Sequence, residues 1–251
     1  MLFVPFAANF FLMDMRNLQR PKAVLFDLFH TLVSVPPPAL TSERPVPEIL
    51  GVSAEEWQRL YYDEDVFGRA LGLVSDAVEA MRKVTHAIDP TVDEARILSA
   101  VESRRRRFEM GLVSVEPSIL AAVDSLRAAG IRTAIVSDAG ADDVESWLRS
   151  PLVSRIDATI FSYRVGYRKP DPRIYQDALN AVGVAPADAI FVGDGGSDEH
   201  TGARALGMRT VLVTGYYARW WPEQIPARRL LADYEFEDVA AFVDALGLIS
   251  D

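Results

Sequence analysis

Short apolar runs recur along the chain and are bounded by charged residues or glycines. The first run is Ala23–Phe26, and four others lie in the second half of the chain, at Thr133–Val136, Ala158–Phe161, Ala189–Val192 and Thr210–Val213. Uninterrupted apolar runs of this length, with β-branched residues among them, are typical of strands that are buried on both faces. They predict the inner strands of a sheet.

Segments with helical periodicity separate these runs. Ile119, Val123 and Leu126 mark one face of a predicted helix that Gly130 ends. Other predicted helices are Val144–Leu148, one from Asp171-Pro172 to Gly183, one that runs to about Leu206 before Gly207, and Val239–Leu246. This alternation predicts an α/β fold with a doubly wound parallel sheet.

A proline-rich break follows the first predicted strand, with Pro36–Pro38 in a row and Pro45 and Pro47 soon after. Consecutive prolines cannot continue a helix or a central strand, so this stretch is a predicted linker. From about Val46 to Val113 only helical patterns occur, and we expect four or five helices there. Capping boxes are predicted at Ser53 with Glu56 and at Thr91 with Glu94.

This organisation predicts a core that is interrupted by a helical insertion. Residues 21–35 and 114–251 form the predicted α/β core, and residues 36–113 form a helical domain inserted into it. The crossings between them are expected near Val35–Val46 and Val113–Pro117. Residues 1–20 are expected to be an N-terminal extension or, alternatively, a packed strand or helix. Their apolar part is too short to span a membrane and lacks a signal-peptide pattern.

Composition and charge narrow the classes of function. The formal net charge is −10, which argues against a general nucleic-acid-binding protein. No cysteine is present, which excludes disulfides and thiol catalysis, and three histidines argue against a multi-histidine metal site. Oxygen ligands are left for a metal, and these suit Mg²⁺. We expect a cytoplasmic monomer or homodimer that binds neither nucleic acid nor a membrane.

Asp27 is the first candidate for chemistry, because it directly follows the apolar run Ala23–Phe26. An ionised carboxylate beside a buried strand is costly unless a cation pairs with it. The carboxyl end of a strand is also where ligands bind in open α/β sheets. The alternative is a strand-end Asp that only caps the next turn.

Further polar residues follow predicted strands or lie in the loops after them, namely Ser137, Lys169, Asp194, Asp198 and Glu199. The four motifs that contain these candidates read, in order, FDLFHTLV, AIVSDAG, VGYRKPDP and FVGDGGSDEHTGARALGM. Jointly they resemble the motifs of the haloacid dehalogenase-like hydrolase superfamily, from about Pro21 to Thr214. The resemblance implies a Rossmann-like core with a helical cap of the first class that closes over Asp27.

The resemblance also implies roles for these residues. Asp27 would attack phosphorus and form an aspartyl-phosphate, a covalent intermediate. Ser137 would hydrogen-bond the phosphoryl group, and Asp138 beside it is a candidate for substrate binding. Lys169 would neutralise the nucleophile and the transferred oxygens, although a surface-loop lysine is the alternative.

The same resemblance implies a cofactor, Mg²⁺. Its ligands would be Asp27, the carbonyl of Phe29 and Asp194. Either Asp198 or Glu199 would support the metal. Counting back from Gly202-Ala203 favours Glu199, whereas the shorter spacing favours Asp198.

The first motif departs from the common phosphatase pattern. Phe29 stands where that pattern has an Asp that acts as general acid and base, and His30 stands where it usually has Gly. His30 could supply the proton instead, or it could be a plain loop residue. Haloacid dehalogenases carry an aromatic Tyr at the position of Phe29 but lack the acidic pair. Phosphonate-cleaving members use a Lys in the insert, where Lys83 is the only one.

Two groups in the helical segment have alternative interpretations. The charge run Arg104–Arg107 is expected to be a solvated helix face rather than a phosphate site. Trp57, Tyr61 and Tyr62 are expected to form core rather than a ligand site.

The predicted function is a Mg²⁺-dependent phosphatase that acts on a small phosphorylated metabolite. The alternatives are a dehalogenase-like or phosphonate hydrolase, or a binding protein that lost turnover through Phe29. Fold-level resemblance does not separate them, because function belongs to the site.

Overall fold

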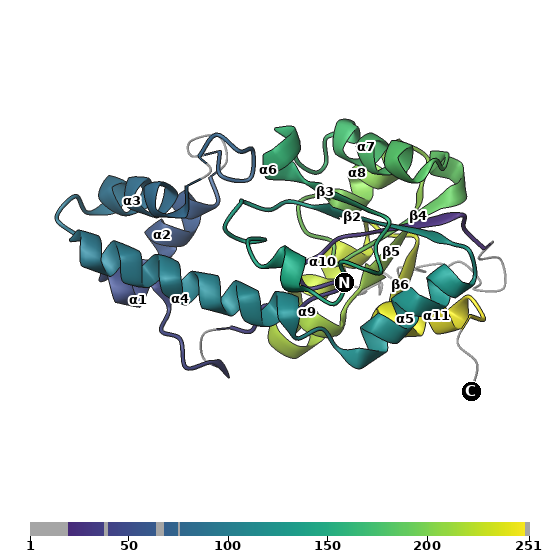
Figure 1. The fold of residues 1–251 in the computed structure, drawn as a ribbon, viewed down its shortest axis with the longest axis horizontal. Helices are drawn as coiled ribbons and strands as arrows, with labels where there is room; N and C mark the ends of the chain where they lie inside the picture. Colours follow the sequence, from purple (N-terminus) through teal and green to yellow (C-terminus); the bar gives the residue numbers. More distant parts are fainter. Residues whose placement is uncertain (1–19, 38–39, 64–67, 75, 249–251) are drawn as a thin grey trace, which may run out of the picture.

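The computed structural model describes residues 20–37, 40–63, 68–74 and 76–248. The expectation of an extension or packed segment in residues 1–20 therefore lies almost wholly outside the described residues. The centre of the described part is a six-stranded parallel sheet with the order β3-β2-β1-β4-β5-β6 (Figure 1). Its strands are β1 (Ala23–Phe26), β2 (Arg132–Ser137), β3 (Ala158–Phe161), β4 (Ala189–Gly193), β5 (Arg209–Val213) and β6 (Tyr234–Phe236). The predicted α/β class with a doubly wound parallel sheet is confirmed.

The register of the sheet places the ends of its central strands side by side. Phe26 of β1 is paired with Ile135 of β2 on one side and with Val192 of β4 on the other. Parallel strands end at a common edge, and ligands bind at that edge in α/β proteins. The polar residues at these three ends are Asp27, Ser137 and Asp194.

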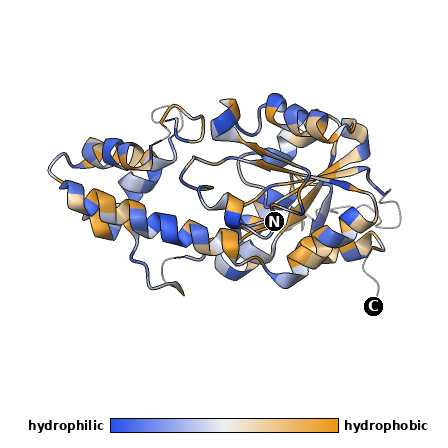
Figure 2. Cartoon of the chain, in the orientation of Figure 1, coloured by the Kyte–Doolittle hydropathy of each residue, from blue (hydrophilic) through white to orange (hydrophobic). Residues whose placement is uncertain are grey.

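Helices cover both faces of the sheet (Figure 1). One face carries α5 (Pro117–Ala128) and α11 (Val239–Ala245), and the other carries α7 (Pro172–Val182) and α8 (Glu199–Ala205). Val24 and Phe26 of β1 belong to the apolar cluster on the first face, whereas Ala23 and Leu25 belong to the cluster on the second. Orange strands lie between the two helix layers in Figure 2. This double burial explains why the run is apolar without alternation.

Four helices of the described residues precede α5, and we call them the helical unit. They are α1 (Val46–Leu50), α2 (Ala54–Tyr61), α3 (Ala77–Ile88) and α4 (Glu94–Val113). The unit has an apolar cluster of its own, which includes Trp57, Tyr61 and Ile97. From this cluster, α4 extends to the core, where it contacts the short 3₁₀ helix η3 (Trp147–Arg149). The expected helices are present, and the domain boundaries stay a prediction.

One predicted helix start is confirmed and another is wrong. The hydroxyl of Ser53 accepts a hydrogen bond from the Glu56 N–H at 3.3 Å, as a capping residue does. The cap of α4 is Asp93, which accepts from the Arg96 N–H at 2.9 Å, and not Thr91. Thr91 is bound instead to the carboxylate of Asp89, so the helix starts later than predicted.

The predicted helix at Val144–Leu148 is also wrong. This segment forms turns that end in η3. Val144 and Trp147 are buried three residues apart, which suits the tighter 3₁₀ turn. Pro151 follows, and a residue before proline avoids the α conformation, so a longer helix cannot form there.

The remaining elements are short and were not predicted. They are the helices α6 (Ser162–Val165), α9 (Gly215–Trp220) and α10 (Ile225–Arg229), the 3₁₀ helices η4 (Pro186–Asp188) and η5 (Pro222–Gln224), and the edge strand β6. None of the helices in the described part of the chain combines the length and the apolar character that a membrane crossing requires.

Candidate active site

A buried lysine joins two carboxylates at the carboxyl edge of the sheet. Nζ of Lys169 lies 2.6 Å from Oδ1 of Asp27 and 2.6 Å from Oε2 of Glu199. All three side chains are almost completely buried. Oδ2 of Asp27 accepts a hydrogen bond from the hydroxyl of Thr31 at 3.2 Å. The structure thus brings the predicted nucleophile and the predicted lysine into direct contact.

Three carboxylates share this site. Asp27, Asp194 and Glu199 each offer an oxygen, and these oxygens all lie within 4.8 Å of one another. Glu199 reaches the group because Gly193 has no side chain, since a Cβ there would lie 2.1 Å from Oε1 of Glu199. Backbone amides hold two of the acids, with Gly195 N–H donating to Glu199 at 2.7 Å. The FVGDGG motif therefore shapes the acidic group as well as contributing to it.

The acidic group places three ionisable acids beside two protein cations. Burial alone would lower the pKa of Lys169, but Asp27 and Glu199 raise it well above its ordinary value, so it is a cation. Burial and the charge of Asp27 raise the pKa of Asp194 to about 6. Burial likewise raises the pKa of Glu199. Arg228 is the second cation, 3.3 Å from Oδ1 of Asp194. Three acids thus face two cations, and a further cation would stabilise the ionised group.

The structure separates the two acids that the sequence left open. Glu199 is buried in the acidic group, whereas the side chain of Asp198 is exposed and lies outside that group. Asp198 immediately precedes α8, with φ at +49° and no side-chain capping bond. Of the two acids, Glu199 therefore belongs to the acidic group and Asp198 does not.

Ser137 and Asp138 border the same site. The hydroxyl of Ser137 is buried and has no hydrogen-bond partner among the described residues. Asp138 accepts a hydrogen bond from the Lys169 N–H at 2.9 Å, and burial raises the pKa of its carboxyl group. A buried unpartnered hydroxyl is unfavourable, so Ser137 is available for a ligand.

Phe29 and His30 lie at the boundary between the core and the helical unit. The ring of Phe29 meets Phe108 of α4 edge-on, with centroids 5.2 Å apart. His30 has φ at +65°, the conformation that favours glycine, and its ring stacks on Tyr216 at 3.8 Å. Burial lowers the pKa of His30 to about 4, so the ring is neutral near pH 7. This does not support the hypothesis that His30 supplies the missing proton.

Residues 21–207 match the family described as haloacid dehalogenase-like hydrolase. The chain belongs to this family. It is 26% identical to (S)-2-haloacid dehalogenase 1 of Pseudomonas sp. (strain CBS-3) over 195 residues, which cover 76% of this chain and 84% of that protein. It is 28% identical to phosphoglycolate phosphatase of Rhodospirillum rubrum over 235 residues, 90% of this chain and 91% of that one.

Solved structures show the same fold. The 2-haloacid dehalogenase from Pseudomonas syringae pv. Tomato DC3000 superposes with a TM-score of 0.62 at 22% identity, over 90% of this chain and 98% of that chain. The family match, rather than this likeness of fold, makes the protein a haloacid dehalogenase-like hydrolase. Its relatives include both dehalogenases and phosphatases.

In this hydrolase a cleft of about 1010 Å³ opens between the helical unit and the core. Residues that follow the nucleophile and the serine in sequence line it, namely Phe29, His30 and Asp138. Aromatic side chains contribute from both sides, with Trp57, Tyr62 and Phe108 from the helical unit and Tyr216, Tyr217 and Trp221 from the core. Pockets of this size accommodate whole small molecules.

The core aromatics of the cleft were missed by sequence reasoning. They lie in the segment GYYARWW, at and after α9, where the density of aromatic residues is the available signal. Sequence reasoning also missed Arg228. Its guanidinium lies over the ring of Tyr217, 3.7 Å from the ring centroid, and only the structure shows this contact.

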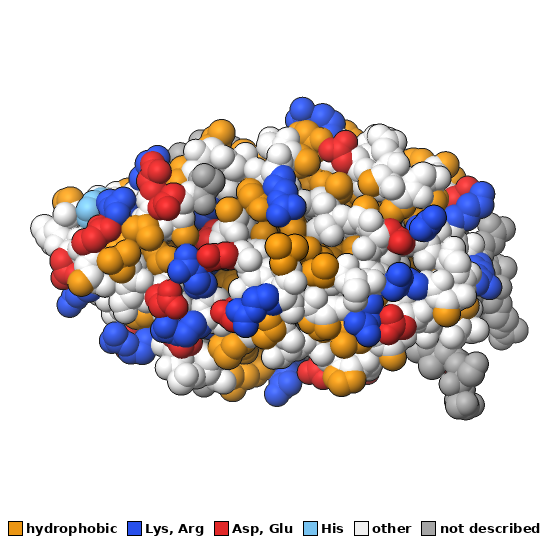
Figure 3. Space-filling view, in the orientation of Figure 1, with side chains coloured by type: hydrophobic (Ala, Val, Ile, Leu, Met, Phe, Trp, Pro, Cys, Tyr) orange, Lys and Arg blue, Asp and Glu red, His pale blue; other side chains and the backbone are white. Residues whose placement is uncertain are grey.

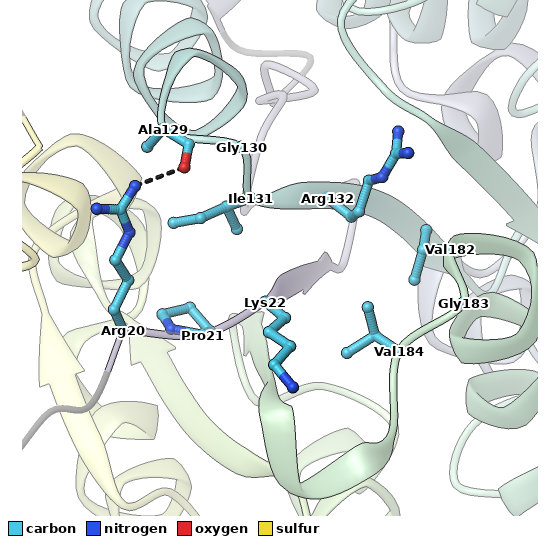
Figure 4. Close-up of a pocket in the computed structure, with 10 residues that line it drawn as sticks. All are labelled: Arg20, Pro21, Lys22, Ala129, Gly130, Ile131, Arg132, Val182, Gly183 and Val184. Atoms are coloured by element: carbon cyan, nitrogen blue, oxygen red, sulfur yellow. Dashed lines mark hydrogen bonds between the residues drawn. The ribbon is translucent and has the colours of Figure 1, made fainter.

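A second hollow lies at the opposite edge of the sheet (Figure 4). It is lined by the segments 20–22, 129–132 and 182–184, which lie at the starts of strands β1 and β2 and at the end of helix α7. Its charged lining residues are basic: Arg20, Lys22 and Arg132. Among the described residues that line it there is no carboxylate, so these residues offer no nucleophile comparable to Asp27.

Arg104 differs from its prediction. Its side chain is buried, and it pairs with Asp142 and Asp143 of the loop after β2. Arg69 pairs with the same two acids, and both guanidinium groups lie against the ring of Tyr61. We call these five residues the buried ion network; it joins the helical unit to the core.

Two other arginines of the charge run fit the prediction, whereas Arg107 is partly buried and lines the cleft. Arg105 pairs with Glu145 and Arg106 with Glu43 at the surface. Basic and acidic side chains are interspersed over the face shown in Figure 3. The solvated-face prediction therefore holds for Arg105 and Arg106 and is wrong for Arg104.

The structure bears on two expectations about the helical segment, one for its aromatic residues and one for Lys83. Trp57 and Tyr61 belong to the core of the helical unit, whereas Tyr62 is 51% exposed and lines the cleft. Lys83 pairs with Glu79 at the surface, at 2.8 Å, and does not line the cleft. This gives no support to phosphonate cleavage through Lys83.

Proposed function

We propose that this hydrolase is a Mg²⁺-dependent phosphatase. The observation that carries the proposal is the buried group of three carboxylates, Asp27, Asp194 and Glu199. A nucleophilic carboxylate alone suffices for displacing a halide, and two additional buried acids would only repel the substrate's carboxylate. A phosphatase has a use for them, because they bind the metal that offsets phosphoryl charge.

The donor set fits Mg²⁺. The ligands would be carboxylate oxygens of Asp27 and Asp194 and the carbonyl of Phe29. Glu199 would support these ligands without being one of them. These are hard oxygen donors, and the three ionisable acids at the site favour a divalent cation. When bound, Mg²⁺ would offset the charge that develops on the phosphoryl oxygens.

The residues of the chain account for the reaction. The Asp27 carboxylate attacks phosphorus and the bond from phosphorus to the ester oxygen breaks. The alcohol leaves as its oxyanion, which takes a proton from solvent, and the phosphoryl group is carried as an aspartyl-phosphate. Water then attacks this phosphorus, which releases inorganic phosphate and restores the carboxylate. Lys169, 2.6 Å from Asp27, orients the nucleophile and offsets charge. The unpartnered Ser137 hydroxyl donates to a phosphoryl oxygen.

Metal removal tests this proposal. With EDTA we expect phosphate release from a panel of phosphomonoesters to cease, and added Mg²⁺ to restore it. Chloride release from 2-chloropropionate, measured in parallel, should stay at background with or without metal. Full phosphatase activity in EDTA would refute the metal requirement. Chloride release that is unchanged by EDTA would instead support a dehalogenase, the alternative that Phe29 and the dehalogenase relative favour.

A leaving-group series tests the consequence of Phe29. A positioned general acid contributes about 10²- to 10⁴-fold, and no side chain supplies one at Phe29. We expect kcat to fall steeply from aryl to alkyl phosphates as the pKa of the leaving alcohol rises. Because His30 is neutral, His30→Ala should keep the same slope.

The matched pair for this series is Phe29→Asp and Phe29→Leu. Both lose the ring contact with Phe108, but only the first adds an acid. Phe29→Asp should flatten the slope, and Phe29→Leu should preserve it. A flat series in the wild type would show that another group of the enzyme donates the proton.

A further inference from the structure

Arg107 is a cation of the cleft that a backbone carbonyl holds in place, with no acidic partner among the described residues. Its Nε and Nη2 both donate to the carbonyl oxygen of Pro36, at 3.2 and 3.1 Å. This contact uses one edge of the planar guanidinium and fixes its orientation. The other edge, formed by Nη1 and Nη2, is the fork that binds a carboxylate or phosphate bidentately.

The neighbouring charges leave Arg107 unbalanced. Among the described residues no carboxylate is within ion-pair distance of it, and burial together with the charge of Arg104 lowers its pKa. Glu43, an acid whose charge acts on Arg107, is held by two hydrogen bonds from Arg106. Asp143, an acid of the cleft lining, is used by the buried ion network. The part of the chain that the structure describes therefore offers Arg107 no acidic partner, and an anionic ligand would supply one.

The walls around Arg107 are aromatic. Phe108 follows it in α4, and Tyr62, Tyr216 and Trp221 line the same cleft. Flat aromatic side chains on both sides of a cleft favour a flat apolar ligand. A volume of about 1010 Å³ also exceeds what a two-carbon phosphate needs.

We propose that Arg107 is a specificity residue that binds a second anionic group of the substrate. The substrate class is a phosphomonoester with a flat, apolar body and a carboxylate at the end remote from the phosphoryl group. This inference rests on the proposed phosphatase function. The phosphoryl group lies at Asp27 and the body lies between the aromatic walls, so the carboxylate meets the free edge of Arg107.

The experiment compares aryl phosphates with and without this charge by KM, because the paired probes also differ in the pKa of the leaving phenol and therefore in kcat. The probes are phenyl and biphenyl phosphates that carry a terminal carboxylate, each beside its neutral methyl ester. For at least one length we expect KM of the acid to be about ten- to one-hundred-fold lower than that of the ester, the factor for a charge-assisted hydrogen bond. Arg107→Gln should abolish this gap through KM and leave kcat unchanged.

Arg106→Gln is the matched control, because it removes the same charge from the next position of α4, outside the cleft lining. It should keep the gap between acid and ester. A merely structural role of Arg107 would weaken both probes alike. Equal KM values for acid and ester in the wild type, or a gap that survives Arg107→Gln, would overturn the inference; the exposed Arg168 of the lining would then be the next candidate.

A binding measurement separates this inference from the proposed reaction. Trp57 and Trp221 line the cleft, so quenching of tryptophan fluorescence reports the same probes without turnover. If no probe is hydrolysed but the acid still binds more tightly than the ester through Arg107, the anion site stands and the phosphatase proposal fails. If the probes are hydrolysed without any preference for the acid, the phosphatase proposal stands and the anion site fails.

Discussion

Asp27→Asn is expected to lower phosphatase turnover by about 10⁴-fold or more, the order of loss seen when a covalent nucleophile is removed. An amide is a poor nucleophile, and the neighbouring acids cannot replace it because they hold other contacts. Asp194 accepts from the Gly196 N–H, and Glu199 is bound to Lys169 and Gly195. The measurement is single-turnover phosphate release with saturating Mg²⁺.

The fold of this variant should remain intact. Lys169 keeps its ion pair with Glu199, and one of the acids that repel one another loses its charge. Asp188→Asn is the control, since it makes the same change of charge in an acid that pairs with Lys22. This control should keep full turnover. Near-normal turnover in Asp27→Asn would exclude the covalent mechanism.

Much of the fold could be predicted because strands that are buried on both faces consist of consecutive apolar residues. β1, β2 and β4 are buried on both faces, so each reads as a continuous apolar run. β6 has three residues, alternates in burial and lies at the sheet edge, so it gave no such signal. The turn at Val144 was mistaken for a helix because its apolar spacing suits either structure.

Most residues of the site could be predicted from the sequence, but the contacts between them could not. Asp27 and Lys169 were found from their motifs, whereas the choice between Asp198 and Glu199 depends on where α8 begins. The missing side chain of Gly193 admits Glu199 to the acidic group, a contact that spacing does not report.

Arg104 shows a more general limit of sequence interpretation. On its own helix it is one of four consecutive arginines, and such a run predicts exposure. Its partners, Asp142 and Asp143, lie 38 and 39 residues away on a loop of the core. Only tertiary structure brings these charges together, so local patterns carried no sign of the buried ion network.

Asp143→Asn is expected to lower the free energy of unfolding by about 3–5 kcal/mol, because it leaves two buried guanidinium groups with one carboxylate. Asp143 is 3% exposed and pairs with both Arg69 and Arg104. Asn keeps the shape of the side chain and an acceptor for the Gly140 N–H, so the loss reports charge. Urea unfolding followed by circular dichroism measures it, and Glu145→Gln, a change at an exposed ion pair, should cost less than about 1 kcal/mol.

A second substitution tests whether this loss of stability comes from an unpaired buried charge. Adding Arg104→Met to Asp143→Asn restores the balance of charge, because Arg69 then faces Asp142 alone at 3.1 Å. We expect the double variant to be more stable than Asp143→Asn, although Arg104→Met by itself destabilises the wild type. Opposite signs for the same substitution in the two backgrounds follow from burial of the unpaired charge. If the two changes are additive, or if Asp143→Asn costs under about 1 kcal/mol, the network does not hold the helical unit to the core through its charges.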